Sequence, residues 1–329
     1  MHDRINPSPR FTQRLVADGW FGNDRLVVVD VGVRDGFESH WAPYGDAVHL
    51  IGFEPDVEEC QRLEARGRKN EQFLPLALSR RKETRDFYHA ASAYASSVFE
   101  SDPDMAARIH DGDCMAVADR TAMECVDLDS ALRDHGIPRV DFIKLDCEGA
   151  ELAILQGAAE TLDRGVLGLT CECWFQVFRR DQPLFSEVEL LLREHGYTLF
   201  DLAAQRHARS VASAVLAGHP RGVPTSFGQV VWANCVFLRD PVIEITRDAA
   251  AAAKWPSLRL LKLLSLMELF DLVDCALELL DFSLKRKLVP EELAELRDLL
   301  EIRTLEAAPP ASPRRRLAGW IRRLSGSGG

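Results

Sequence analysis

Short apolar runs rich in Val, Ile and Leu alternate with helix-like segments from residue 26 onward, and this alternation is the strongest constraint on the fold. Alternating strands and helices of this length are typical of βαβ units, which place their strands in a parallel sheet covered by helices. Near the start of the chain the predicted strands are LVVVDV at 26–31, AVHLIGFE at 47–54 and QFLPLALS at 72–79, with a predicted helix at 56–68. The sequence therefore predicts an α/β fold built on a parallel sheet.

The alternation is interrupted once and then resumes. After Arg80 a stretch rich in Ser, Ala and Asp runs to about residue 112, and we expect it to be an irregular excursion over one end of the sheet. Beyond it, strands are predicted at 121–128, 140–146, 166–175, 197–202 and 232–240, and helices at 129–135, 149–157 and 186–195. Ser186 is the expected N-cap of the last of these helices, and Gly196 ends it.

The composition changes to Leu, Ala, Glu and Lys from residue 248, with apolar residues at helical spacing, which predicts a helical appendage. Pro290 is expected in the first turn of one of its helices, where the amide that proline lacks has no partner anyway. The sequence is thus predicted to divide into four segments: an N-terminal arm at 1–25, an α/β domain at 26–242, a helical extension at 248–306 and a basic, disordered tail at 307–329.

The bulk composition indicates a globular protein, because 329 residues that are 47% hydrophobic and 28% charged suffice for one large domain and an appendage. The formal net charge of −11 argues against nucleic acid as a partner, since an acidic surface repels phosphates. Eight cysteines are scattered without a CxxC pair, the first 21 residues lack the apolar core of a secretory signal, and no apolar stretch reaches about 18 residues. We therefore expect a cytoplasmic protein with reduced thiols.

The first predicted strand ends in a glycine-containing turn, VVVDVGVRDG, with the spacing Asp30-x-Gly32-x-x-x-Gly36. Such a turn lets backbone amides approach a ligand, and an acid at the tip of the next strand, here Glu54, suits a ribose diol. The second and third glycines of the dinucleotide pattern are absent, which argues against a nicotinamide cofactor. S-adenosylmethionine is favoured; another nucleotide and a turn without any ligand remain as alternatives.

The segment at 141–151, DFIKLDCEGAE, followed by LAILQGA, resembles the signature strand and helix of the FkbM family of S-adenosylmethionine-dependent methyltransferases. The glycine turn, GFEPD, PLALS, VDLDSAL, CECWF and HGYTLFDL agree with that family in the same order, over roughly residues 26–240. The resemblance implies a Rossmann-like (class I methyltransferase) doubly wound sheet of about seven strands, followed here by the C-terminal helical extension. The chain departs from the family pattern at Val33-Arg34-Asp35, where Arg34 either meets the ligand or points to solvent.

The same resemblance implies site residues at the carboxyl ends of the strands. The expected methionine contacts are Asp30, Gly32 and Gly36, the ribose contact is Glu54, and the adenine contacts are Leu76 and Ala77 at the tip of the third strand. Asp146 is expected to face the methyl-transfer centre and is our first candidate for the residue that orients or deprotonates the acceptor; its alternative role is to bind the following helix or the cofactor amine.

Other candidates for the base are weaker. Glu148 and Glu172 are second choices, Glu151 is expected on the exposed face of its helix, and His40 and His89 are alternative bases. Three acids at strand ends could gather magnesium, but no spacing demands it, and we predict no metal.

The resemblance also implies an O-methyltransferase that acts on a hydroxyl of a sugar, a glycan or a polyketide-type acceptor. The expected acceptor wall is the excursion at 85–113, with Tyr94, Ser96 and Ser97. The rival hypothesis is a noncatalytic binding module that docks a protein through the leucine-rich run at 258–280; we favour the packing of that run on its own domain. The basic segment Arg314–Arg323 suggests peripheral contact with the inner membrane surface, or a solvated end that docks on the acidic body.

Overall fold

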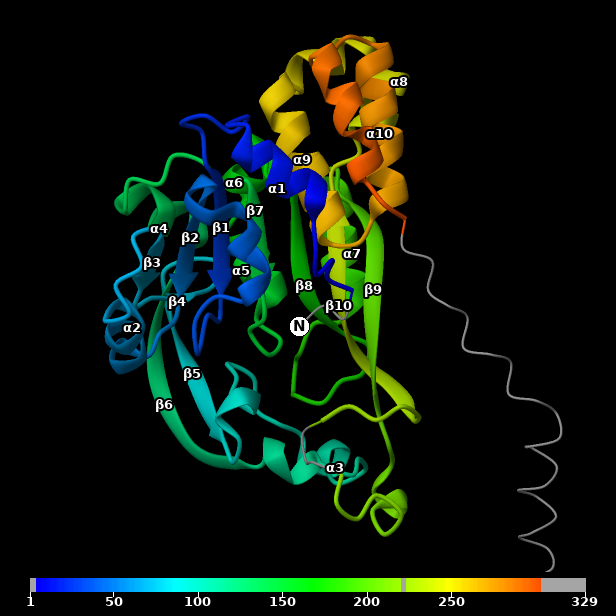
Figure 1. Ribbon diagram of the computed structural model, residues 1–329. Helices are drawn as coiled ribbons and strands as arrows, with labels where there is room; N and C mark the ends of the chain where they lie inside the picture. Colours follow the sequence, from blue (N-terminus) through cyan, green and yellow to red (C-terminus); the bar gives the residue numbers. More distant parts are fainter. Residues whose placement is uncertain (1–3, 220–222, 303–329) are drawn as a thin grey trace, which may run out of the picture.

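A seven-stranded sheet forms the centre of the protein in the computed structural model, which describes residues 4–219 and 223–302 (Figure 1). Its strands, in spatial order, are β3 (Glu71–Leu74), β2 (Val48–Phe53), β1 (Leu26–Val31), β7 (Phe142–Leu145), β8 (Gly168–Trp174), β10 (Gln229–Leu238) and β9 (Thr198–His207). The first five strands are parallel, whereas β10 is antiparallel to both of its neighbours. The sheet is therefore mixed: the parallel arrangement predicted from the alternation holds for five strands, and β10 departs from it. The doubly wound order and the seven strands are as predicted.

The strand order reverses beside β1, since the chain runs outward to β3 and then returns to β7 on the other side. Such a switch point leaves a crevice at the carboxyl ends of the two central strands, which is where open α/β sheets bind ligands. The α-helices that accompany the strands are α2 (Val57–Glu64), α4 (Leu128–Asp134), α5 (Glu151–Gln156), α6 (Ala159–Arg164) and α7 (Phe185–Glu194).

Alternation along β1 divides the core between the two faces of the sheet. Leu26 and Val28 belong to one apolar cluster, and Val29 and Val31 belong to another. Successive side chains of a strand point to opposite faces, so a strand buried on both faces is apolar at nearly every position. The run LVVVDV is such a strand, and its single acid is discussed with the site below.

The first of these clusters is covered by the N- and C-terminal helices, which lie together at the top of Figure 1: α1 (Arg10–Ala17), α8 (Pro241–Arg247), α9 (Ser257–Leu269) and α10 (Val273–Lys285). Every residue of α9 from Leu260 to Leu269 is buried. The leucine-rich run thus packs on its own domain, as we favoured, and offers no broad apolar face to a partner. Within the described part of the chain, no helix has the length and apolarity to cross a membrane.

The segment expected to be irregular forms a second sheet instead. It consists of β4 (Ala77–Leu78), β6 (Val117–Val126) and β5 (Glu83–Ala90), and the short helix α3 (Pro103–Ala106) lies in the connection between β5 and β6. The predicted strand 72–79 is split at Pro75, because proline lacks the amide that a continuing ladder needs, and its two halves join different sheets. The expectation failed because β5 is amphipathic and weakly apolar, and its stability comes from pairing with β6.

Two expectations about helix ends are also wrong. Ser186 does not cap α7; the helix begins after Leu184, whose backbone amide donates to the Glu187 carboxylate at 2.9 Å. Pro290 precedes a 3₁₀ segment rather than standing in the first turn of an α-helix. The 3₁₀ segments are η1 (Ser39–Ala47), η2 (Ala93–Ala95), η3 (Gly112–Met115), η4 (Ser210–Ala212), η5 (Ala249–Lys254) and η6 (Glu291–Leu299). The tail at 307–329, with Arg314–Arg323, lies outside the described residues.

Candidate functional site

A cavity of about 440 Å³ opens at the carboxyl ends of β1, β2 and β7, on the side of the main sheet that faces β5 and β6 (Figure 1). Of the predicted cofactor contacts and the first- and second-choice acids, all but Asp30 line this cavity: Gly32, Gly36, Glu54, Leu76, Ala77, Asp146, Glu148 and Glu172. They come from five segments of the chain, so the fold brings together residues that are up to 140 positions apart. We refer to it as the main cavity.

The turn after β1 passes very close to the end of β7. Gly32 and Gly36 have φ values of +84° and +99°, which favour glycine, and a Cβ on Gly32 would lie 2.2 Å from the Asp146 carbonyl oxygen. No larger residue fits at Gly32 without displacing the Asp146 backbone. The glycine therefore sets how closely the first turn and the acid-bearing loop approach each other.

Asp30 is the one predicted cofactor contact that does not line the main cavity. It is buried beneath the turn, and its carboxylate accepts a hydrogen bond from Lys144 Nζ at 3.0 Å. Burial raises the pKa of Asp30 to about 6 even though Lys144 lies beside it, whereas the pKa of Lys144 is raised against its own burial by Asp30 and Asp146. We infer that Lys144 is charged, because at least two acids, Asp30 and Asp146, lie close to it and stabilise its ammonium form. Asp30 therefore acts on the cavity through Lys144, which does line it.

Glu54 lies at the tip of β2, and one hydrogen bond to a backbone amide fixes the orientation of its carboxylate. Its Oε1 accepts from the Asp56 backbone amide at 3.0 Å, and burial raises its pKa. Arg34 also lines the cavity, 3.8 Å from the Asp56 carboxylate, so the residue that departs from the family pattern lies at the rim. Its side chain is 41% exposed, so Arg34 lies between the ligand space and solvent.

Leu76 lies on the connection from β3 to β4 and Ala77 begins β4 of the second sheet, so neither residue is at the tip of β3 as expected. They still reach the main cavity, where Val98 and Met123 from the insertion complete an apolar wall. A flat apolar wall beside Glu54 suits an aromatic base attached to a ribose.

Four carboxyl groups gather below the ends of β7 and β8. Asp146 is partly exposed and lies 3.8 Å from Lys144 Nζ; Glu148 binds Arg179; and Glu172 Oε1 accepts from Trp174 Nε1 at 2.8 Å. Burial and the neighbouring carboxylates raise the pKa of Glu172 well above its usual range, and burial raises the pKa of Glu148 although Arg179 opposes it. Such an arrangement of perturbed acids in a cavity is typical of a functional site.

The fourth carboxyl group, Glu151, contradicts our expectation that it lies on the exposed face of its helix. It is only 2% exposed, and its carboxylate accepts from the Cys147 backbone amide at 2.7 Å. Burial raises its pKa to about 7 against the backbone hydrogen bonds that favour the ionised form. The short α5 packs this side chain beneath the loop, so Glu151 holds the backbone that presents Asp146 and Glu148.

The insertion supplies part of the cavity, as the sequence suggested. Tyr94 and Ser96 line it, and the Tyr94 hydroxyl donates to the Asp35 carboxylate at 2.9 Å. Ser97 instead donates to the Glu148 carbonyl at 2.8 Å and so fixes the acid-bearing loop.

Neither alternative base lines the main cavity. His40 Nδ1 lies 3.0 Å from Glu38, in a small neighbouring recess that also includes Lys144 and Asp146. His89 Nε2 lies 2.9 Å from the Thr121 hydroxyl on the second sheet. In the described ranges, no group of three His, Cys, Asp or Glu side chains is placed to hold a metal ion.

A smaller cavity of about 120 Å³ adjoins the main one, and we call it the inner cavity. Tyr94, Glu148 and Trp232 line both, and Asp111, Arg179 and His207 line the inner one. Sequence reasoning did not identify Asp111, Arg179, Trp232 or His207. The only available signal was the alternation in CECWF, which places Glu172 and Trp174 on one face of β8.

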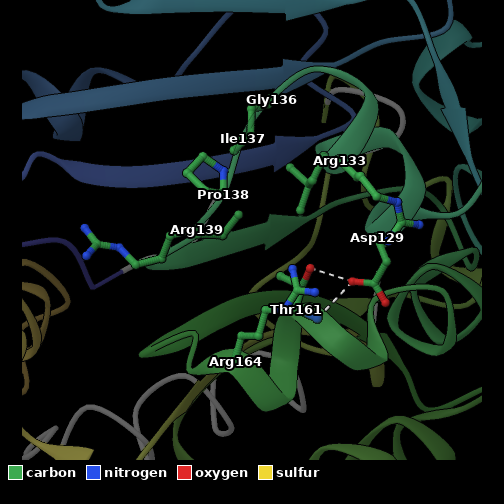
Figure 2. A pocket seen from close by; sticks show the side chains of 10 residues that line it. Asp129, Arg133, Gly136, Ile137, Pro138, Arg139, Thr161 and Arg164 are labelled. Carbon is green, nitrogen blue, oxygen red and sulfur yellow. Dashed lines mark hydrogen bonds between the residues drawn. The ribbon is translucent and has the colours of Figure 1, made fainter.

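Another hollow, of about 260 Å³, lies at the amino end of β7 between α4 and α6 (Figure 2). Its arginines are already paired: Arg133 and Arg164 approach Glu160, while Arg139 binds Asp24 and points away from the other two. Asp129 accepts from the Thr161 backbone amide and hydroxyl, which ties α4 to α6 (Figure 2). The hollow lies at the wrong end of the strands for a ligand of this fold.

The sequence of residues 30–199 matches the model of the methyltransferase FkbM domain. The solved structure of an FkbM methyltransferase from Methylobacillus flagellatus KT is similar at 14% identity, covering 65% of this chain and 44% of that one, with a TM-score of 0.34. The magnesium protoporphyrin IX methyltransferase from Synechocystis PCC 6803, solved with bound S-adenosylmethionine, is similar at 9% identity, covering 70% and 79%, with a TM-score of 0.30. No curated protein matches the sequence.

Proposed function

Because this chain belongs to the FkbM methyltransferase family, we propose that it methylates a hydroxyl group of a sugar, glycan or polyketide-type acceptor. S-adenosylmethionine is the cofactor of this family and supplies the methyl group when bound. The observation that carries the proposal is that the glycine turn, Glu54 and the acid-bearing loop after β7 surround a single cavity.

The residues of the main cavity fit a cationic sulfonium cofactor. The turn at Gly32 would meet the methionine part, Glu54 the ribose diol, and the apolar wall at Leu76 and Ala77 the adenine. Glu38, Glu54, Asp146, Glu148 and Glu172 outnumber Arg34 and Lys144 as charged or ionisable groups of the lining. A site with an excess of carboxyl groups favours a cation over an anionic dinucleotide.

Methyl transfer to an oxygen requires mainly that the acceptor hydroxyl be placed in line and that its proton be removed. Asp146 and Glu148 are the proposed candidates to orient the hydroxyl and take the proton, since both line the main cavity from one loop. Glu172 is a poorer candidate, because burial and the neighbouring carboxylates disfavour its ionised form and raise its pKa, and its Oε1 already accepts from Trp174 Nε1. Lys144 holds Asp146 in place from the Asp30 side.

Calorimetric titration with S-adenosylhomocysteine tests this proposal, with NAD as the control ligand. We expect micromolar binding by the native protein and binding at least about tenfold weaker in Glu54→Ala, because the ribose loses its hydrogen bonds to a charged group. Glu58→Ala, an exposed acid four positions further on, is the matched control and should bind like the native protein. A native protein that does not bind S-adenosylhomocysteine would overturn the proposed function; unchanged binding by Glu54→Ala would overturn only the ribose contact.

A further inference from the structure

The inner cavity joins the main cavity at the acid-bearing loop. Glu148 faces both, and the indole of Trp232 stands on the other side of the junction. An acceptor held in the inner cavity would therefore present one end to the proposed transfer centre. The inner cavity is lined by residues from β8, from the end of β9, from the first half of β10 and from the segment between β5 and β6.

Arg179 contributes two hydrogen-bond donors without partners. Its side chain is fully buried; Nη2 donates to the Glu148 carboxylate and to the Ala95 carbonyl, the latter at 3.2 Å. The guanidinium lies over the Trp174 ring, 4.7 Å from its centroid. Nε and Nη1 are buried and have no hydrogen-bond partner among the residues that the structure describes. Because buried donors in proteins are nearly always paired, Arg179 is suited to a ligand with acceptor oxygens.

His207 also lines the inner cavity. Its Nδ1 lies 3.1 and 3.2 Å from the two Asp111 carboxylate oxygens, so Nδ1 carries a proton, and in the neutral form of the ring Nε2 has a lone pair that can accept a hydrogen bond. Burial alone would raise the pKa of Asp111, but the interactions with His207 and a backbone hydrogen bond together outweigh burial and keep that pKa below its usual value. Nε2 is buried and, within the described ranges, has no partner.

We propose that the inner cavity binds the acceptor as a single neutral sugar ring, with Arg179 donating to its oxygens and His207 Nε2 accepting from one of its hydroxyls. This inference rests on the proposed function and names the acceptor for the same site. A volume of about 120 Å³ corresponds to roughly ten water-sized positions, comparable to one hexose and too small for a polyketide.

The charges of the inner cavity favour a neutral ring over an anionic one. Arg179 is already balanced by Glu148, and Asp111 accepts from His207, so no positive charge is left over for a carboxylate or phosphate. Trp174 and Trp232 add aromatic surface, on which the apolar C–H face of a sugar ring packs. Donors, acceptors and aromatic faces in one small cavity are the chemistry that recognises a carbohydrate.

The indole N–H signals of the full-length protein report on this cavity, since Trp174 and Trp232 are two of only six tryptophans. The protein is saturated with S-adenosylhomocysteine and titrated with the methyl glycosides of glucose, galactose, mannose and rhamnose, with signals assigned through Trp232→Phe and Trp174→Phe. We expect at least one glycoside to shift one of these two signals.

Two substitutions of His207 then test the contribution of its Nε2 atom to glycoside binding. In His207→Asn, the amide nitrogen replaces Nδ1 and retains the bond to Asp111, but the Nε2 atom is lost, and we expect glycoside affinity to fall at least tenfold. In His207→Gln, the amide lies near the position of Nε2, and part of the affinity should return. His89→Asn, on β5 and outside both cavities, is the matched control and should leave the affinity unchanged.

The outcomes separate this inference from the proposed function. Failure to bind S-adenosylhomocysteine would overturn the function itself. Binding of S-adenosylhomocysteine with no glycoside shifting either indole would overturn the sugar-binding cavity while the methyltransferase assignment stands. A glycoside affinity that is the same in His207→Asn as in the native protein would overturn the role of His207.

Discussion

Two clusters of buried charge lie at opposite ends of the central strands, and they differ in how completely they are paired. At the amino end of β7, Lys262 Nζ donates to Asp24 at 3.0 Å, to the Arg25 carbonyl at 2.7 Å and to Asp141 at 2.9 Å. An ammonium has three protons, so each of them has an acceptor. At the carboxyl end, Arg179 has two donor nitrogens, Nε and Nη1, with no partner within residues 4–219 and 223–302, and several carboxyl groups lie near one another.

The difference in pairing distinguishes a structural cluster from a functional one. A cluster in which every donor has an acceptor needs no ligand to complete its hydrogen bonds, and the Lys262 cluster joins α9 to the start of the sheet. A partly paired cluster is costly to bury, and in a native protein such a cost is typical of a site where a ligand completes the pairing. The acids at the carboxyl end thus mark the site independently of any family resemblance.

The largest effect expected from this comparison is the loss of stability in Lys262→Met. Asp141 would remain buried with Arg139 and the Val27 amide as partners, so the free energy of unfolding should fall by about 3–4 kcal/mol, the lower part of the range for breaking a buried pair. Denaturant titration measures this, with the exposed Lys82→Met as the matched control. Equal stability of the two variants would show that the Lys262 cluster is not structural.

The next largest effect is expected in the pH dependence of stability, through Glu151 in the cluster at the carboxyl end of the strands. The pKa of Glu151 is about 7 in the folded protein, above its ordinary value of 4.5, so the folded state binds more protons between these values and stability falls as pH rises through that window. Glu151→Gln keeps an acceptor for the Cys147 amide and removes the titration. Between pH 5 and pH 8, the native protein should lose roughly 2–3 kcal/mol more stability than the variant. Denaturant titrations at both pH values check this; parallel losses would mean that Glu151 does not carry the perturbed pKa.

The smallest effect is expected at the hollow shown in Figure 2, at the same end of the sheet as the paired cluster. Arg133 is exposed and its nearest acid, Glu160, is 3.8 Å away, so Arg133→Ala should change the free energy of unfolding by less than about 0.5 kcal/mol. The affinity for S-adenosylhomocysteine should remain within about twofold, as measured by calorimetry. A tenfold loss of this affinity would indicate a ligand site at the amino end of the strands and would contradict the contrast drawn between the two ends.

The parts of the molecule that sequence reasoning predicted best are those with local patterns. The strand at 140–146 and the acids after it were predicted because an apolar run followed by acid and glycine identifies a strand end on its own. The glycine turn and Glu54 followed from spacing, and they line the main cavity as expected. The second sheet was missed because β5 is mostly polar and was not predicted as a strand, although most of its partner β6 was predicted at 121–128, and because their pairing joins positions 27 to 42 residues apart.

The inner cavity shows the limit of such reasoning at the site. His207 stands at the end of β9, and Asp111 precedes η3, almost a hundred positions earlier, so no spacing connects them. Glu151 was predicted on the exposed face of its helix, because helical periodicity does not say which neighbour covers an acid.

The sequence by itself determined the α/β class, the cofactor turn and the identity of the acids at the strand ends, because each depends on residues within one strand and its following turn. Only the tertiary structure decided which acids are buried, that Asp30 acts through Lys144, and that Arg179 and His207 face a common cavity. The physical reason is that burial and pairing of charges depend on contacts between distant segments, whereas strand and turn formation depends mainly on near neighbours.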